Sequence, residues 1–173
     1  ILKILSLIEW SSYKSADRII GLAPGIVSGI AKFRIETDRI HLIPNGCDIE
    51  FFDPLKNNKW SPIETENSKF VAVYSGTLGH ANGVENIILC AKELKDRNRD
   101  DIIFIIAGDG SRKKTIEKMI KHYQLNNVYL VGLLEKTKIS ELINMADLGI
   151  QSLRNVPEFY RGTSPNKFFD YIA

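Results

Sequence analysis

Segments with two different spacings of apolar residues alternate along the 173 residues of this chain. Segments with an apolar residue every three to four positions are typical of amphipathic helices, and short runs of Ile, Val and Leu are typical of strands buried in a parallel sheet. Helices are predicted over residues 1–16, 24–33, 83–95, 112–123, 137–145 and from 164 onward, and strands over 17–22, 38–43, 70–74, 101–107, 128–131 and 147–152. This alternation predicts an α/β fold with Rossmann-like, doubly wound parallel sheets.

The alternation is interrupted once, over residues 46–68. This stretch is polar and contains Pro54 and Pro62, which is typical of an interdomain linker. We therefore expect three parts: residues 1–45 as the C-terminal part of one Rossmann-like domain, 46–68 as the linker, and 69–173 as a second, incomplete Rossmann-like domain. The chain begins without Met and ends inside a predicted helix, so we expect both ends to be cuts through a longer protein.

Composition and charge indicate an ordinary globular protein. Hydrophobic residues make up 44% and charged residues 25%, and the 23 Lys and Arg nearly balance the 21 Asp and Glu, so no nucleic-acid partner is expected. Cys47 and Cys90 are far apart and have neither metal-ligand nor disulfide-framework spacing. A reducing, cytoplasmic compartment is the simpler expectation.

The first segment with candidate chemistry is 75–83, Ser-Gly-Thr-Leu-Gly-His-Ala-Asn-Gly, between a predicted strand and a predicted helix. Its glycines allow the backbone to approach a ligand closely, and the helix that follows offers free N–H groups to a phosphate. The spacing is not the dinucleotide fingerprint G-x-G-x-x-G. The alternative is a strand-to-helix turn that binds nothing.

A second segment, Gly108-Asp109-Gly110, also follows a predicted strand. In open α/β sheets ligands bind at the carboxyl ends of the strands, so this position is compatible with a site. Asp-Gly is equally common in plain turns, which is the alternative interpretation.

The third segment, residues 161–171, is the most informative. Ser164 is a good N-cap and Pro165 a good first helical residue, which places Lys167 in the first turn and Asp170 on the same face. A lysine near a helix N-terminus is electrostatically unfavourable unless an anion binds there. A diphosphate would fit Lys167, and Asp170 would then accept hydrogen bonds from ribose hydroxyls. The alternative is a local ion pair between these two side chains.

Five stretches together resemble one family, the retaining glycosyltransferases of family 4, also described as glycosyl transferases group 1, which have the GT-B fold. Residues 38–54, DRIHLIPNGCDIEFFDP, resemble the crossover into the C-terminal, donor-binding domain. The remaining stretches resemble successive elements of that domain: AVYSGTLGHANGVENIILCAKELK, IIFIIAGDGSRKKTIEKM, NNVYLVGLLEKTKISELINMADLGIQSL and GTSPNKFFDYIA. The resemblance spans essentially the whole chain.

The resemblance implies transfer of a hexosyl group, with retention of anomeric configuration, from a nucleotide diphosphate sugar to a glycan or lipid-linked acceptor. It implies no metal cofactor and names no catalytic residue. Lys167 matches the family's basic residue at the diphosphate, and Asp170 matches the second acidic residue of its E-x7-E motif. The implied donor site has three parts: Gly76, Thr77, Arg161, Ser164 and Lys167 at the diphosphate, Asp170 at the ribose, and Val131, Gly132 and Leu133 flanking the base.

The sequence departs from the family pattern at three positions. Thr77 and Asn82 stand where many members have Arg and Lys, and Gly162 stands where the first glutamate of E-x7-E would fall. The usual carboxylate contact to the donor sugar is therefore not expected, and Arg161 and Lys167 are expected to supply the phosphate charge. This variant resembles bacterial members that build cell-envelope polysaccharides.

Two other functions keep the same fold: a nucleotide-sugar epimerase and a non-catalytic nucleotide-binding module. The chain by itself is expected to be inactive, because the acceptor side of a GT-B cleft lies in the other domain. A basic stretch is either a solvated helix face or a contact with an anionic membrane surface at the cytoplasmic side of a membrane. It comprises Arg112, Lys113, Lys114, Lys118 and Lys121.

Overall fold

The computed structural model describes residues 2–55, 59–64, 69–160 and 162–173. The chain divides into two compact units, which are described separately. The first unit comprises Ile1–Gly46 and Asn155–Asn166, and the second comprises Cys47–Arg154 and Lys167–Ala173. Two predicted features fall partly or wholly outside the described residues: Arg161, and parts of the polar stretch 46–68.

The first unit contains a small parallel sheet. Strands β1 (Ile19–Gly21) and β2 (Ile40–Leu42) pair in parallel, and helices α1 (Leu2–Ser15) and α2 (Pro24–Ala31) and the 3-10 turns η1 (Thr37–Arg39) and η3 (Pro157–Tyr160) complete it. Pro24 occupies the first turn of α2, where its missing N–H has no intrahelical partner to lose. The core of this unit is formed by Ile19, Ile30, Ile35 and Ile40.

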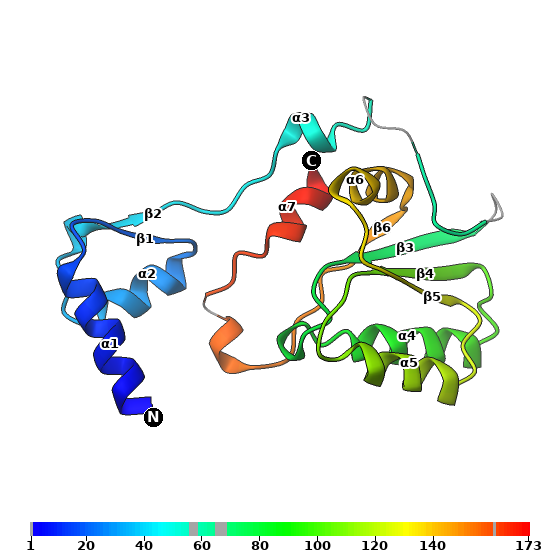
Figure 1. The fold of residues 1–173 in the computed structure, drawn as a ribbon, viewed down its shortest axis with the longest axis horizontal. Helices are drawn as coiled ribbons and strands as arrows, with labels where there is room; N and C mark the ends of the chain where they lie inside the picture. Colours follow the sequence, from blue (N-terminus) through cyan, green and yellow to red (C-terminus); the bar gives the residue numbers. More distant parts are fainter. Residues whose placement is uncertain (1, 56–58, 65–68, 161) are drawn as a thin grey trace. The chain divides into compact units, whose positions relative to one another are not determined.

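The second unit is a four-stranded parallel sheet with helices on both faces (Figure 1). Its strands are β3 (Phe70–Ser75), β4 (Ile102–Ala107), β5 (Val128–Gly132) and β6 (Leu148–Gly149), in the spatial order β5-β4-β3-β6. Its helices are α3 (Ile49–Phe52), α4 (Glu85–Asp96), α5 (Lys113–His122), α6 (Lys136–Met145) and α7 (Asn166–Ile172), and η2 (His80–Asn82) is a 3-10 turn. The predicted α/β fold with doubly wound parallel strands is confirmed.

Residues of β3 and β4 alternate between two cores because successive side chains of a strand point to opposite faces. Ala72, Tyr74 and Phe104 pack under α4 and α5. Val73 and Ile105 face the side that α6 covers. Both faces of the central strands are therefore buried, as the unbroken apolar run at 102–107 predicted.

Part of the polar stretch 46–68 packs on the second unit. Residues Ile49–Phe52 form α3, capped by the Asp48 side chain, which accepts from the Phe51 N–H. The Ser140 hydroxyl on α6 donates to the Phe51 carbonyl at 3.2 Å, and the Trp60 N–H donates to the Glu141 carbonyl. These contacts hold α3 and Trp60 against α6.

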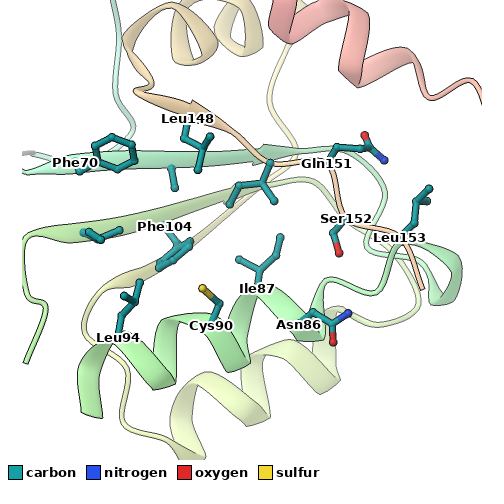
Figure 2. Close-up of a pocket in the computed structure, with 13 residues that line it drawn as sticks. Phe70, Asn86, Ile87, Cys90, Leu94, Phe104, Leu148, Gln151, Ser152 and Leu153 are labelled. Atoms are coloured by element: carbon teal, nitrogen blue, oxygen red, sulfur yellow. The ribbon is translucent and has the colours of Figure 1, made fainter. Parts of the chain in front are cut away.

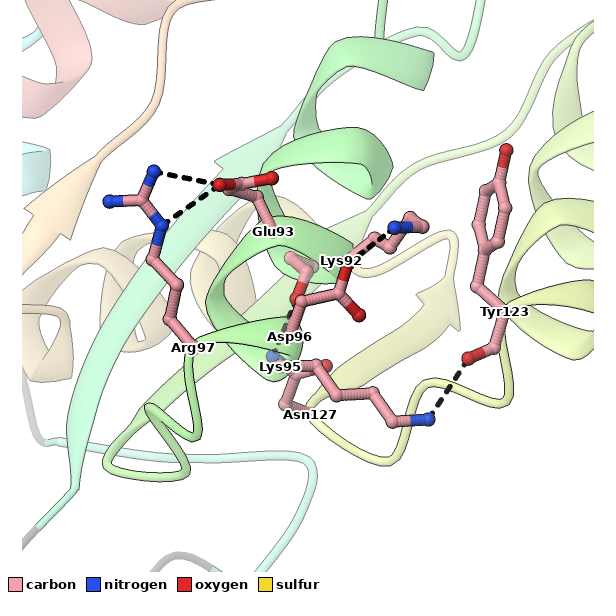
Figure 3. A network of polar contacts seen from close by, with 8 residues as sticks. Lys92, Glu93, Lys95, Asp96, Arg97, Tyr123 and Asn127 are labelled. Atoms are coloured by element: carbon pink, nitrogen blue, oxygen red, sulfur yellow. Dashed lines mark hydrogen bonds and ion pairs between the residues drawn. The ribbon is translucent and has the colours of Figure 1, made fainter.

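Helices α4 and α5 are joined by a lysine (Figure 3). Lys95 Nζ donates to the carbonyls of Tyr123 and Gln124 at 3.0 and 2.7 Å, at the C-terminal end of α5, where a cation is favourable. The neighbouring ion pair between Arg97 and Glu93 lies on the exposed face of α4, and exposed pairs of this kind contribute little to stability.

Within the described residues, no helix is long and apolar enough to cross a membrane.

Candidate functional site

The sheet has one point where the direction of winding reverses. The chain runs from β3 to β4 to β5 in one direction, and α6 then carries it back to β6 on the other side of β3. In open α/β sheets ligands bind in the crevice outside the carboxyl ends of the two strands that flank this switch point. The site is therefore expected where β3 ends at Ser75 and β6 ends at Gly149.

Backbone hydrogen bonds connect the loop after β3 to the loop after β4, and the loop after β4 to the end of β5. The Gly76 N–H donates to the Ala107 carbonyl at 2.9 Å, and the Gly108 N–H donates to the Gly132 carbonyl at 2.7 Å. The Leu78 N–H donates to the Asp109 carbonyl at 2.9 Å. The loop after β3 therefore has a contour fixed by its neighbours.

Gly108 is required by this arrangement. A Cβ at this position would lie 1.9 Å from the Gly76 carbonyl oxygen, and its φ of +145° is one that other residues rarely adopt. The Asp109 carboxylate accepts from the Gly110 N–H at 2.6 Å and from Lys113 Nζ at 2.9 Å, and the Lys113 contact lowers the pKa of Asp109. The structure thus accounts for the Gly-Asp-Gly segment by loop packing, in agreement with its interpretation as a turn.

Lys167 lies directly against the loop after β3. Its Cε and Nζ are 2.9 and 3.3 Å from where a Cβ on Gly76 would stand, so a side chain there would displace the end of the lysine, and the φ of +145° at Gly76 is one that other residues rarely adopt. Its ammonium lies 5.1 Å from the centroid of the Tyr74 ring, within range of a cation–π interaction. Burial lowers the pKa of Lys167.

No carboxylate among the described residues lies within ion-pair distance of Lys167. The alternative of a local ion pair with Asp170 is therefore not what the structure shows. Asp170 is half-buried on α7, and burial raises the pKa of its carboxyl while the charge of Lys136 opposes that shift. Lys167 is a partly desolvated cation for which the described residues provide no carboxylate counter-charge.

The start of α7 differs slightly from the prediction. The helix begins at Asn166, one residue after the predicted first position at Pro165. Ser164 belongs to the first unit, where its hydroxyl accepts from the Asn45 N–H at 3.3 Å and its carbonyl accepts from Asn45 Nδ2 at 2.5 Å.

Thr77 and the end of β5 occupy the same edge of the sheet. The Thr77 side chain is exposed, and its carbonyl accepts from the Tyr74 hydroxyl at 2.9 Å and from Asn82 Nδ2 at 2.7 Å. Gly132 ends β5 with a φ of +75° and has open space around it, and Leu133 is 77% exposed. The structure therefore brings Gly76 and Lys167 into contact, and places Thr77 and residues 131–133 on loops at the same edge of the sheet.

Sequence reasoning did not identify Tyr171. Its hydroxyl accepts from the Ser75 N–H at 2.9 Å, and its ring occupies the space beside Gly149, where a Cβ would lie 2.5 Å from the ring. Glycine inside a predicted strand is a signal of such a close approach. Gln151 was also missed: both polar atoms of its side-chain amide are buried, and neither has a hydrogen-bond partner among the described residues.

A groove of about 490 Å³ lies on the opposite face, between α4 and the β3 and β6 edge of the sheet (Figure 2). Phe70, Ile87, Cys90, Phe104 and Leu148 contribute to its apolar lining. None of its 13 lining residues is charged, so the groove offers no cation to a phosphate.

Comparison with known proteins points to one family. WcaI of Escherichia coli, named as a candidate colanic acid biosynthesis glycosyl transferase, is 24% identical over 153 residues, which are 84% of this chain and 36% of WcaI. The solved structure of Anabaena Alr3699/HepE with UDP and glucose has a TM-score of 0.64 at 18% identity, over 82% of this chain and 39% of that one. WaaG, a glycosyltransferase involved in lipopolysaccharide biosynthesis, has a TM-score of 0.62 at 17% identity, over 79% of this chain and 38% of WaaG.

The structural likenesses establish the fold as that of these glycosyltransferases. The chain spans about a third of the length of the curated relatives it matches. The sequence model described as Glycosyl transferases group 1 matches residues 56–158, more than half of the chain. This protein chain therefore belongs to the glycosyl transferases group 1 family, as its sequence resemblance predicted.

Proposed function

We propose that this chain is the donor-binding part of a glycosyltransferase. The enzyme transfers a hexosyl group, with retention of anomeric configuration and without a metal ion, from a nucleotide diphosphate sugar to a glycan or lipid-linked acceptor. The observation that carries the proposal is the position of Lys167. No carboxylate in the described part of the chain pairs with this cation, which is held against Gly76 at the end of β3, next to the switch point of the sheet.

The electrostatics of Lys167 favour an anionic ligand. Burial penalises its charged form, and among the described residues no carboxylate compensates this cost. A diphosphate bound beside the loop would compensate the ammonium group of Lys167 for its lost contact with water. The positive charge of Lys167 would in turn stabilise the diphosphate as it departs during sugar transfer. Fixed cationic groups at a developing anion are the main source of catalysis in many enzymes.

The remaining site residues are assigned from the family resemblance. Gly76 and Thr77 present loop backbone to the diphosphate, with Arg161 and Ser164 as further phosphate contacts. Asp170, one turn after Lys167 on α7, accepts hydrogen bonds from the ribose. Val131, Gly132 and Leu133, at the end of β5, flank the base.

The relatives indicate which donors and acceptors to examine first. HepE was solved with UDP and glucose, WaaG is involved in lipopolysaccharide biosynthesis, and a 26% identical relative from Streptomyces kanamyceticus is an alpha-D-kanosaminyltransferase. We therefore propose a UDP-sugar as donor and a cell-envelope polysaccharide or lipid-linked glycan as acceptor. Such an enzyme would work in the cytoplasm, at the inner face of the membrane when the acceptor is lipid-linked.

Calorimetric titration of the full-length protein with UDP, GDP, ADP and NAD tests the donor site. A ligand that binds only the folded protein also raises its apparent stability, so a thermal-shift measurement provides a second readout. We expect UDP or GDP to bind, and binding to be lost in Lys167→Ala but kept in Lys114→Ala, which removes an exposed lysine of α5. Equal affinities of these two variants would contradict the assignment of Lys167.

A further inference from the structure

The side chain of Gln151 poses a problem of polar satisfaction. Its Oε1 and Nε2 are both buried, and neither has a hydrogen-bond partner among the described residues. Leaving a buried polar group without a partner costs stability, so such groups are rare in folded proteins. An amide in which both the donor and the acceptor are unpaired needs a specific explanation.

The sheet register places Gln151 at the switch point. Leu148 and Gly149 of β6 pair with Ala72 and Val73 of β3, and the Ile150 N–H continues this ladder by donating to the Val73 carbonyl at 2.7 Å. Two residues after Gly149, Gln151 is level with Ser75, at the carboxyl end of β3.

The same register determines which face of the sheet carries the amide. The regular pairing of β6 ends at Gly149, which faces the Tyr171 ring of α7, and continuing the alternation of side chains past Ile150 brings Gln151 to the same face. Gln151 is one of the residues that line the apolar groove, and Figure 2 shows that its amide points away from Ile87 and Cys90 on the floor of that groove. Gln151 is thus on the side of the sheet that carries α7.

The unpaired groups match a hydroxyl-bearing ligand. A carboxamide has an NH2 that donates and an oxygen that accepts, and a sugar hydroxyl also donates and accepts. A phosphate oxygen would use only the NH2 and would leave Oε1 unpaired. Hydroxyl groups satisfy both atoms.

We infer that Gln151 is a donor-binding residue whose carboxamide hydrogen-bonds hydroxyl groups of the bound nucleotide sugar. The inference rests on the proposed function, because it takes the ligand of the switch-point crevice to be a nucleotide sugar. The hydroxyls belong either to the ribose or to the transferred sugar, and the choice of probes distinguishes these two sources.

Gln151→Leu in the full-length protein provides the test. Leucine keeps much of the volume and removes both polar atoms. Since no hydrogen bond within the described residues is lost, we expect the Tm of the ligand-free protein to be unchanged or raised. We expect the affinity for the bound donor to fall about tenfold, which corresponds to one or two lost hydrogen bonds.

The probes are UDP with UDP-glucose, and GDP with GDP-mannose, and the pair that the wild-type protein binds is used. If the ribose is the partner, Gln151→Leu weakens the nucleoside diphosphate and the nucleotide sugar equally. If the transferred sugar is the partner, only the nucleotide sugar is weakened. Either pattern supports the inference.

Asn127→Leu is the matched control, because it removes another buried amide with one unpaired oxygen at the opposite edge of the sheet, just before β5. Asn127 Nδ2 donates to the Ala91 carbonyl, so this variant is expected to lose stability and keep its affinity. Unchanged donor affinity in Gln151→Leu, whatever its Tm, would overturn the inference. A wild-type protein that binds none of the four probes would instead overturn the proposed function, so the two failures are distinguishable.

Discussion

The backbone N–H of Ser75 donates a 2.9 Å hydrogen bond to the phenolic oxygen of Tyr171, a residue 96 positions later in the chain. This bond fastens the last turn of α7 to the end of β3. Lys167 lies one helical turn before Tyr171, so the same anchor holds its ammonium group against the loop at Gly76. The position of the proposed phosphate-binding cation thus depends on the anchor that Tyr171 provides.

Tyr171→Phe should destabilise the protein and loosen the site. Phenylalanine keeps the ring beside Gly149 but leaves the buried Ser75 N–H without its acceptor, which costs about 1–3 kcal/mol in the free energy of unfolding. Urea denaturation measures this change. Tyr129→Phe, on a partly exposed side chain of β5, should change the free energy of unfolding by less than about 0.5 kcal/mol. Similar losses in the two variants would show that the Ser75 bond contributes nothing specific.

Lys167→Met should separate stability from binding. Methionine keeps the apolar stem and removes a cation whose burial is unfavourable, so the stability of the ligand-free protein should be unchanged or slightly higher. A hydrogen bond to a charged group contributes about 1.5–3 kcal/mol, so UDP affinity should fall by roughly 10- to 100-fold. Isothermal titration measures the affinity, and Lys114→Met on the exposed face of α5 is the control. A stability loss with unchanged UDP affinity would assign Lys167 to packing alone.

The lowered pKa of Lys167 predicts a pH dependence with a definite sign. Burial makes the folded-state pKa lower than the ordinary value of 10.5, so in the window between these two values the unfolded chain binds more protons than the folded one. This group therefore contributes increasing stability as pH rises through that window. UDP affinity should decrease over the same window, because a neutral amine no longer attracts the diphosphate. Titrations from about pH 7 to pH 10, compared with Lys167→Met, check both trends.

Gly108→Ala should disrupt the locked loops. The added Cβ would lie 1.9 Å from the Gly76 carbonyl oxygen, so the loops after β3 and β4 must separate, and we expect a loss of more than about 3 kcal/mol in the free energy of unfolding. Gly132→Ala is the control: it also has a positive φ, but its Cβ would meet open space, so it should cost only about 1–3 kcal/mol of backbone strain. Chemical denaturation compares the two. Equal costs would mean that backbone strain, and not the contact with Gly76, explains the glycine.

Local signals were sufficient to predict most of the elements. The Ile-rich run at 102–107 predicted a strand that is dry on both faces, and Pro24 predicted the start of α2, because each signal depends on near neighbours in the sequence. The strand predicted over 147–152 is shorter, since regular pairing covers only Leu148 and Gly149 beside β3. Helix α3 was not predicted, because it lies in a polar stretch. Its four residues are stabilised by packing on α6 and by the Asp48 cap.

The site was only partly predictable from the sequence, for a physical reason. The electrostatics of Lys167 at the start of a helix indicated an anion without any structure, since they depend on adjacent residues. The Ser75–Tyr171 bond and the unpaired amide of Gln151 arise from tertiary packing between segments far apart in the chain, and no local pattern encodes them. The glycines at 108 and 110 were visible, but their purpose, close approach to the neighbouring loop, required the structure.

The loops at this edge of the sheet take their shape from main-chain hydrogen bonds and glycines, while side chains such as Thr77 and Leu133 project into solvent. Exchanging these exposed side chains leaves the frame intact, whereas exchanging Gly76 or Gly108 does not. Substitutions of these side chains can therefore change the surface that the proposed donor would meet at almost no cost in folding. At this edge of the sheet, the positions that can change freely are therefore different from the positions that hold the fold.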